Sequence, residues 1–213
     1  MTDVLVPGGR DVRGTLEEPA DGEPDAIVVA CPPHPQQGGS RSDRRLVAVG
    51  DVLTDAGIAC LRFDYGEWDE GYGELADARN AVRWAADRYE RVGLFGYSFG
   101  ATLALLAAAE SETVDAVAAL APTARLADDL DAVAALESIS CPVQVCYGER
   151  DRTVEWEPIV ESIRETAAEA ERDGDKTLVA LSGDHFFVGQ QTSIADDVVA
   201  FFESRLRESG DRR

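Results

Sequence analysis

The stretch that most constrains the fold is G-Y-S-F-G at residues 96–100. A short apolar run, Val92–Phe95, precedes it, and a long run rich in alanine and leucine, Ala101–Ala109, follows it. This order predicts a buried strand, a sharp turn and a buried helix. The glycines Gly96 and Gly100 suit that turn, because the strand and the helix leave no room there for side chains. The residue between them, Ser98, is then strained and presents its hydroxyl at a helix N-terminus.

Apolar runs and amphipathic stripes alternate along the rest of the chain. The expected strands are Ala26–Cys31, Ile58–Phe63, Val92–Phe95, Val114–Ala121, Pro142–Tyr147 and Thr177–Leu181. The expected helices are Asp43–Ala56, Glu74–Tyr89, the helix after Ser98, Leu126–Leu136, Glu155–Glu171 and Ile194–Leu206. This alternation predicts an α/β fold, with a mainly parallel sheet and helices on both faces. Two short strands, Val4–Val6 and Val12–Leu16, predict a hairpin at one sheet edge, and we expect residues 1–213 to form a single domain.

The charge of the chain excludes some partners. Acidic residues outnumber basic ones by 41 to 20, which gives a net charge of −21, and Lys176 is the only lysine. Such a charge opposes binding to nucleic acid or to an anionic membrane, so we expect neither as a partner. It favours a halophilic protein, because molar salt screens self-repulsion. The chain shows no signal-peptide pattern and no stretch long enough to span a membrane, which predicts a cytoplasmic location.

The four cysteines give no sign of a metal or redox site. They are Cys31, Cys60, Cys141 and Cys146. None forms a C-x-x-C pair, none has a histidine at zinc-site spacing, and each lies in or beside an apolar run. We therefore expect buried free thiols that act as small apolar side chains.

Polar residues follow the predicted strands at the sheet edge where ligands bind in such folds. Ser98 follows the third strand of the main series, Asp151 the fifth and His185 the sixth. Their order in the chain is that of a nucleophile, an acid and a base. Glu149, two residues before Asp151, is a rival for the acid. Asp184 is next to His185 but carries little weight, because neighbouring side chains on a turn seldom point together.

These motifs resemble the α/β-hydrolase superfamily: G-Y-S-F-G at 96–100, G-E-R-D at 148–151 and D-H-F-F at 184–187. The segments H-P-Q-Q-G-G at 34–39 and L-R-F-D-Y at 61–65 are similar to its small dienelactone-hydrolase-like branch. There are two departures. Ser98 stands where true dienelactone hydrolases have cysteine, and Y-G-E-W-D-E-G at 65–71 replaces the usual R-G-x-G-x-S loop.

The resemblance implies a serine hydrolase that needs no cofactor or metal and cleaves a small carboxylic ester or thioester. Ser98 would form the acyl-enzyme, His185 would act as base, and Asp151 would orient the imidazole. The backbone N–H groups of Phe99 and Gln36 would bind the oxyanion.

His34 would orient its own loop rather than act as a second base. Only about twenty residues separate the strands at Val114 and Pro142, which leaves no room for an inserted cap domain and favours small acyl substrates. Aromatic residues that could line a pocket are Tyr65, Trp68, Tyr72, Tyr97, Phe99, Phe186 and Phe187.

Other functions remain open on the same fold. An acyltransferase or a peptidase would use the same residues, and a non-catalytic member could bind a small acyl ligand instead. A reactive Ser98 separates the enzymes from the binding protein, and the products formed with water or an alcohol separate hydrolase from transferase. The sequence also leaves a homodimer open.

Overall fold

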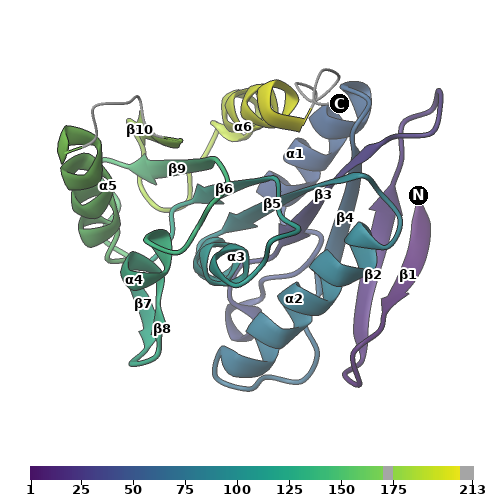
Figure 1. The fold of residues 1–213 in the computed structure, drawn as a ribbon, viewed down its shortest axis with the longest axis horizontal. Coiled ribbons are helices and arrows are strands. Elements are labelled where there is room, and N and C mark those ends of the chain that lie inside the picture. Colours follow the sequence, from purple (N-terminus) through teal and green to yellow (C-terminus); the bar gives the residue numbers. More distant parts are fainter. Residues whose placement is uncertain (170–174, 207–213) are drawn as a thin grey trace.

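The computed structural model describes residues 1–169 and 175–206, and an eight-stranded sheet lies at its centre (Figure 1). The strand order is β1-β2-β4-β3-β5-β6-β9-β10. These strands are β1 (Thr2–Val6), β2 (Val12–Glu17), β3 (Ala26–Cys31), β4 (Ala59–Asp64), β5 (Arg91–Tyr97), β6 (Ala116–Leu120), β9 (Val143–Gly148) and β10 (Lys176–Leu181). The strands from β4 to β10 in that order pair in parallel, whereas β1 and β2 form an antiparallel hairpin at one edge. The predicted parallel sheet and edge hairpin are confirmed.

Helices cover both faces of this sheet. They are α1 (Arg44–Asp55), α2 (Tyr72–Ala86), α3 (Phe99–Ala109), α4 (Ala132–Leu136), α5 (Glu157–Glu169) and α6 (Gln191–Leu206). In Figure 1, α1 and α6 lie together on one side of the sheet, and α2 and α3 lie on the other. No helix in the described ranges is long and apolar enough to cross a membrane.

The alternation of side chains along β3 explains why it needs helices on both sides. Ile27 and Val29 join the apolar cluster under α2 and α3, whereas Val28 and Ala30 join the cluster under α1 and α6. All four are fully buried. Burying one such aliphatic side chain contributes about 1.5–3 kcal/mol, so a continuous apolar run is stable only inside a covered parallel sheet.

The predicted helix over Leu126–Leu136 is wrong in its first half. The structure has a small antiparallel hairpin there, β7 (Arg125–Ala127) and β8 (Leu130–Asp131), and the helix α4 starts only afterwards. Asp131 decides the boundary, because its carboxylate accepts the N–H groups of Val133 and Ala134 and caps α4. The same carboxylate pairs with Arg125 across the hairpin. No inserted cap domain lies between β6 and β9, as predicted.

Smaller differences concern the ends of elements. The helix α2 begins at Tyr72, before the expected start at Glu74, because Gly71 adopts a φ of +99° and starts the helix early. The loop at 34–39 includes one 3₁₀ turn over Pro35–Gln37. The last two residues of the expected helix Glu155–Glu171 lie outside the described residues.

The cysteines are free, as expected. Cys31, Cys60 and Cys146 are buried, and Cys141 is partly exposed. Burial raises the pKa of Cys60 and Cys146 to about 12, so these thiols stay protonated and unreactive near neutral pH.

Candidate active site

The turn between β5 and α3 carries Ser98 in a strained conformation. Its φ is +56° and its ψ is −120°, a combination that costs a non-glycine residue of order 1–3 kcal/mol. The surrounding contacts maintain it: a Cβ on Gly96 would lie 2.1 Å from the carbonyl oxygen of Gly100. A Cβ on Gly100 would lie 2.3 Å from the carbonyl oxygen of Cys31. Only glycine fits at either position, as the sequence predicts.

Three side chains from separate strand ends meet at this turn. The Oγ of Ser98 lies 2.9 Å from Nε2 of His185, and Nδ1 of His185 lies 2.7 Å from Oδ2 of Asp151. His185 and Asp151 are each 5% exposed, and Ser98 is partly exposed. This arrangement can deprotonate the serine hydroxyl and hold the resulting imidazolium against a buried carboxylate.

The geometry distinguishes between the three candidate acids. Asp151 contacts the imidazole, and its second oxygen, Oδ1, accepts the N–H of Thr153 at 2.8 Å. Glu149 is exposed, and the carboxylate of Asp184 is turned back to accept the N–H of Phe186. Thr153 has no sequence signal of its own and is found only from this contact.

Contacts between loops hold His185 in place. The N–H of Arg150 donates to the carbonyl of Gly183 at 3.0 Å, which joins the loop after β9 to the loop after β10. The hydroxyl of Tyr97 donates to the carbonyl of His185 at 2.9 Å. Tyr97, expected as a pocket residue, therefore also anchors the histidine loop, and its burial raises its pKa to about 12.

The loop after β3 offers few oxyanion donors, because three of its residues are prolines and lack an N–H. The N–H of Gln36 donates to Nδ1 of His34 at 3.3 Å, inside its own 3₁₀ turn. Gln36, expected as a donor, is thus already occupied. The backbone N–H of His34 has no acceptor among the described residues. The N–H of Phe99, at the first position of α3, likewise has no acceptor among the described residues.

His34 lines two hollows near Ser98. A hollow of about 150 Å³ has Ser98, His185, Phe186, Arg45 and His34 in its lining. A second, of about 370 Å³, is lined by His34, Trp68, Glu70, Tyr72, Phe99, Leu126 and Ala127. Burial lowers the pKa of the His34 imidazole. A neutral His34 keeps the Nδ1 lone pair that accepts the Gln36 N–H.

The expected aromatic residues divide between these hollows and the core. Trp68, Tyr72 and Phe99 line the larger hollow, and Tyr97 and Phe186 line the smaller one. Tyr65 and Phe187 line neither. Tyr65 is buried, and its hydroxyl donates to the carbonyl of Pro32 at 3.1 Å, whereas Phe187 is fully buried in the core.

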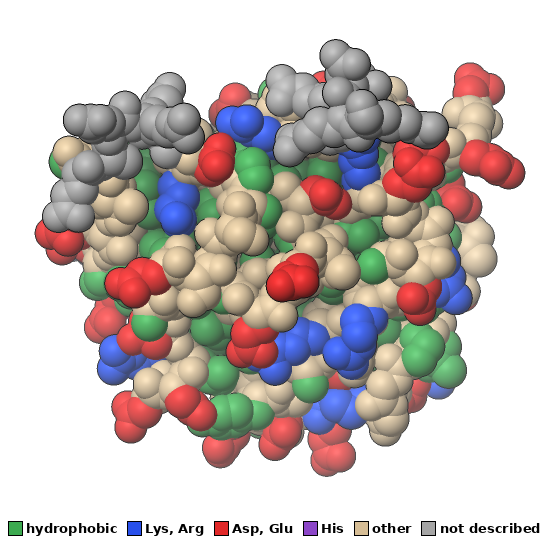
Figure 2. All heavy atoms as spheres, viewed as in Figure 1, with side chains coloured by type: hydrophobic (Ala, Val, Ile, Leu, Met, Phe, Trp, Pro, Cys, Tyr) green, Lys and Arg blue, Asp and Glu red, His purple; other side chains and the backbone are tan. Residues whose placement is uncertain are grey.

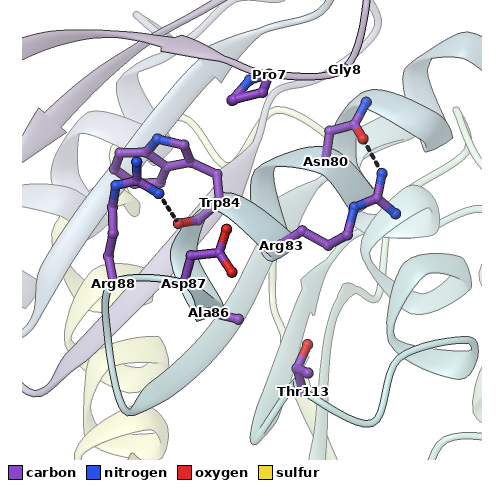
Figure 3. A pocket seen from close by; sticks show the side chains of 9 residues that line it. All are labelled: Pro7, Gly8, Asn80, Arg83, Trp84, Ala86, Asp87, Arg88 and Thr113. Atoms are coloured by element: carbon purple, nitrogen blue, oxygen red, sulfur yellow. Dashed lines mark hydrogen bonds between the residues drawn. The ribbon is translucent and has the colours of Figure 1, made fainter.

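Another hollow, of about 500 Å³, lies around the C-terminal end of α2 (Figure 3). There the guanidinium of Arg88 stacks over Trp84 and donates to its carbonyl, and Arg83 pairs with Asn80. These contacts already occupy both arginines, and no triad residue lines this hollow. Within residues 1–169 and 175–206, no group of three or more His, Cys, Asp or Glu side chains is arranged to hold a metal ion.

Fold and site together define an enzyme of the α/β-hydrolase type. The model of the dienelactone hydrolase family matches residues 65–198, well over half of the chain. The chain therefore belongs to the dienelactone hydrolase family. A search of curated proteins found no match.

Solved structures agree with this assignment. The dienelactone hydrolase from Anabaena variabilis is 26% identical, with a TM-score of 0.75 and 96% of each chain covered. Est1E from Butyrivibrio proteoclasticus is 19% identical, with a TM-score of 0.81 and coverage of 97% of this chain and 99% of that one. XC6422 from Xanthomonas campestris, described as an α/β serine hydrolase without a lid, is 22% identical. Its TM-score is 0.72, over 100% of this chain and 96% of that one.

Proposed function

We propose that this hydrolase cleaves a small carboxylic ester or thioester through an acyl-enzyme on Ser98. The observation that carries the proposal is the unbroken hydrogen-bond chain from Ser98 through His185 to Asp151. Nε2 of His185 would take the hydroxyl proton as Oγ attacks the carbonyl carbon, and would then pass it to the leaving oxygen or sulfur. Water would next attack the acyl-enzyme, again with His185 as base.

The oxyanion of each tetrahedral intermediate needs donors on the side of Ser98 away from the base. We assign this role to the backbone N–H groups of Phe99 and His34, in place of Gln36. Both come from segments in direct contact, because Gly100 packs against the carbonyls of Cys31 and Pro32. Each such donor contributes on the order of 3 kcal/mol to transition-state stabilisation.

The proposal includes a habitat of high salt. The net charge of −21 supports it, and Figure 2 shows acidic side chains distributed over the visible face, with basic side chains between them. Mutual repulsion among these carboxylates is weakened at molar ionic strength, where the Debye length falls to about 3 Å. We expect the midpoint of thermal unfolding to rise as KCl is raised from 0.2 M to 2 M. A midpoint that falls would contradict a halophilic protein.

The function is tested by intact-mass analysis after exposure to a fluorophosphonate in molar KCl, with Ser98→Ala and His185→Ala alongside. We expect one adduct on the wild-type protein and none on either variant. Hydrolysis of 4-nitrophenyl acetate should likewise occur with the wild-type protein and not with either variant. In the presence of methanol, the ratio of acetic acid to methyl acetate measures the preference for water over an alcohol as acceptor. A folded wild-type protein that forms no adduct would refute the proposal.

A further inference from the structure

We propose that the 370 Å³ hollow beside Ser98 binds the acyl part of the substrate, and that it takes a neutral acyl group carrying an aromatic ring. The inference rests on the proposed function and goes beyond it by naming the substrate class. It follows from which residues line each hollow, how the rings of the larger one are arranged, and what charge it carries.

The position of His185 indicates which hollow receives the leaving group and which receives the acyl group. The leaving oxygen must lie within hydrogen-bond reach of Nε2 of His185, because that atom returns the proton. His185 lines the smaller hollow and does not line the larger one. Ser98 also lines only the smaller hollow, and His34 lines both. Phe99, which follows Ser98 and carries one of the assigned oxyanion donors, lines only the larger hollow. The alcohol or thiol therefore leaves on the smaller side, and the acyl group extends into the larger.

Three rings form one wall of the larger hollow. The imidazole of His34 stacks on Trp68 with ring centroids 4.6 Å apart. Phe99 lies 4.9 Å from His34 and 5.7 Å from Trp68. Such a wall favours a planar ring over a flexible alkyl chain, because ring pairs gain free energy beyond the area that they bury.

The rest of the lining is joined to the β7–β8 hairpin. The hydroxyl of Tyr72 donates to Oδ1 of Asp129 in the β7–β8 turn at 2.6 Å. A Cβ on Gly71 would lie 3.0 Å from Leu130, so the loop and the hairpin are in contact here as well. Leu126 on β7 faces the hollow. The lining of the hollow is thus connected from the loop to the hairpin, which holds its rings in place for a flat group.

Buried carboxylates hold the loop that carries Trp68. Both oxygens of the fully buried Glu74 are used, one by the N–H of Asp69 at 2.9 Å and the other by that of Gly71 at 2.8 Å. Asp77, also fully buried, accepts the N–H of Gly66 and the side chain of Arg10. This loop stands where the resemblance leads us to expect R-G-x-G-x-S, so the Trp68 ring comes from a segment that departs from that pattern.

The charge near the site disfavours an anionic acyl group. Among the described residues, Glu70 is the one Asp, Glu, Lys or Arg side chain that lines the larger hollow. Arg45 lines the smaller one, but it is paired with Asp43 and donates to the carbonyl of Phe186 at 2.9 Å. No described cation is left free in either hollow to balance a carboxylate, which argues against dienelactone-type anions as substrates.

The test compares two substrates with one leaving group, 4-nitrophenyl 3-phenylpropanoate and 4-nitrophenyl hexanoate. Both carbonyls adjoin a methylene group, so their intrinsic reactivities match. We expect the wild-type kcat/KM to be about tenfold higher for the aryl ester, which corresponds to about 1.4 kcal/mol. Trp68→Leu and Trp68→Ala should bring the ratio close to one, and Trp68→Phe should retain it. Phe186→Ala, in the smaller hollow, is the matched control and should leave the ratio unchanged.

A carboxylated analogue, 4-nitrophenyl 3-(4-carboxyphenyl)propanoate, tests the charge. It should react more slowly than the parent aryl ester at the lowest salt at which the protein stays folded. Glu70→Gln should recover part of this loss, and Glu67→Gln, an exposed neighbour outside the hollow, should not.

Fluorophosphonate labelling of Ser98 gives the concentration of competent sites in each preparation, so a misfolded variant is recognised. If the wild-type protein is labelled but shows no preference for the aryl ester, the inference is overturned and the proposed function stands. The same holds if the preference persists in both Trp68→Leu and Trp68→Ala. A wild-type protein that is folded but not labelled would overturn both.

Discussion

Glu74→Gln is the substitution that tests most directly how the site is held together. Glu74 is fully buried in the first turn of α2, and its two oxygens accept the N–H groups of Asp69 and Gly71. Arg10 lies 3.8 Å from the carboxylate. Glutamine has one acceptor oxygen, so its NH₂ group must face one of the two backbone N–H groups.

The magnitude follows from these contacts. Losing a hydrogen bond to a charged group costs about 1.5–3 kcal/mol, and a buried N–H left without an acceptor costs about 1–3 kcal/mol. The neutral side chain avoids the desolvation of a carboxylate, which offsets part of this loss. We expect the free energy of unfolding to fall by about 3 kcal/mol, a large share of the 5–15 kcal/mol typical of a domain.

Urea unfolding measures this change. With a slope of about 2 kcal/mol per molar urea, the midpoint should fall by about 1.5 M. Hydrogen exchange should also become faster in the peptide that covers residues 66–73, because its anchoring acceptor is lost. Glu67→Gln, an exposed carboxylate of the same loop, is the control and should change stability by less than about 0.5 kcal/mol. Equal midpoints for the two variants would refute the idea that Glu74 holds this loop.

Three further predictions concern the site. Asp151→Asn should lower kcat about 10⁴-fold, because the asparagine stabilises the wrong tautomer of the imidazole. Glu149→Gln should leave kcat within about twofold of wild type. Steady-state kinetics of the two variants shows which carboxylate orients His185. The pKa of His34 in an NMR titration should lie below the ordinary 6.5, because burial disfavours the imidazolium form. Trp68→Ala should raise this pKa. A wild-type pKa of 6.5 or more would contradict the structure. Gly100→Ala should lower the free energy of unfolding, measured with denaturant, by more than about 3 kcal/mol, because the new Cβ would lie 2.3 Å from a carbonyl oxygen. A variant as stable as the wild type would show that the turn can relax.

The sign of the His34 effect on stability follows from the direction of its shift. Because the folded-state pKa is lowered, the folded protein binds fewer protons than the unfolded chain as His34 titrates. The stability that His34 contributes is complete above about pH 6.5 and is lost as the pH falls through the folded-state pKa. Protonation also removes the Nδ1 lone pair that accepts the Gln36 N–H, so the loop after β3 should loosen over the same range.

Much of the fold could be predicted because its signals are local. The run from Val92 to Ala109 contains a strand, a glycine-flanked turn and a helix, and each depends on neighbouring residues only. The positions of Ser98 and His185 followed from chain order, since parallel strands bring their carboxyl ends to one edge. The hairpin at β7–β8 was missed because the segment from Leu126 to Leu136 is rich in alanine and leucine, which favours helix, while one capping aspartate sets the boundary.

The order of residues along the chain was enough to predict the fold class, the strained turn and the residues that can supply a nucleophile and a base. Only the tertiary structure distinguished Asp151 from Glu149, because side-chain direction on a loop depends on contacts such as the one from Thr153. Only it showed that the N–H of Gln36 is occupied. Beside the larger hollow, Tyr72 donates to Asp129, which lies 57 residues further along the chain. Such contacts have no local signal, since they exist only when packing brings separate segments together.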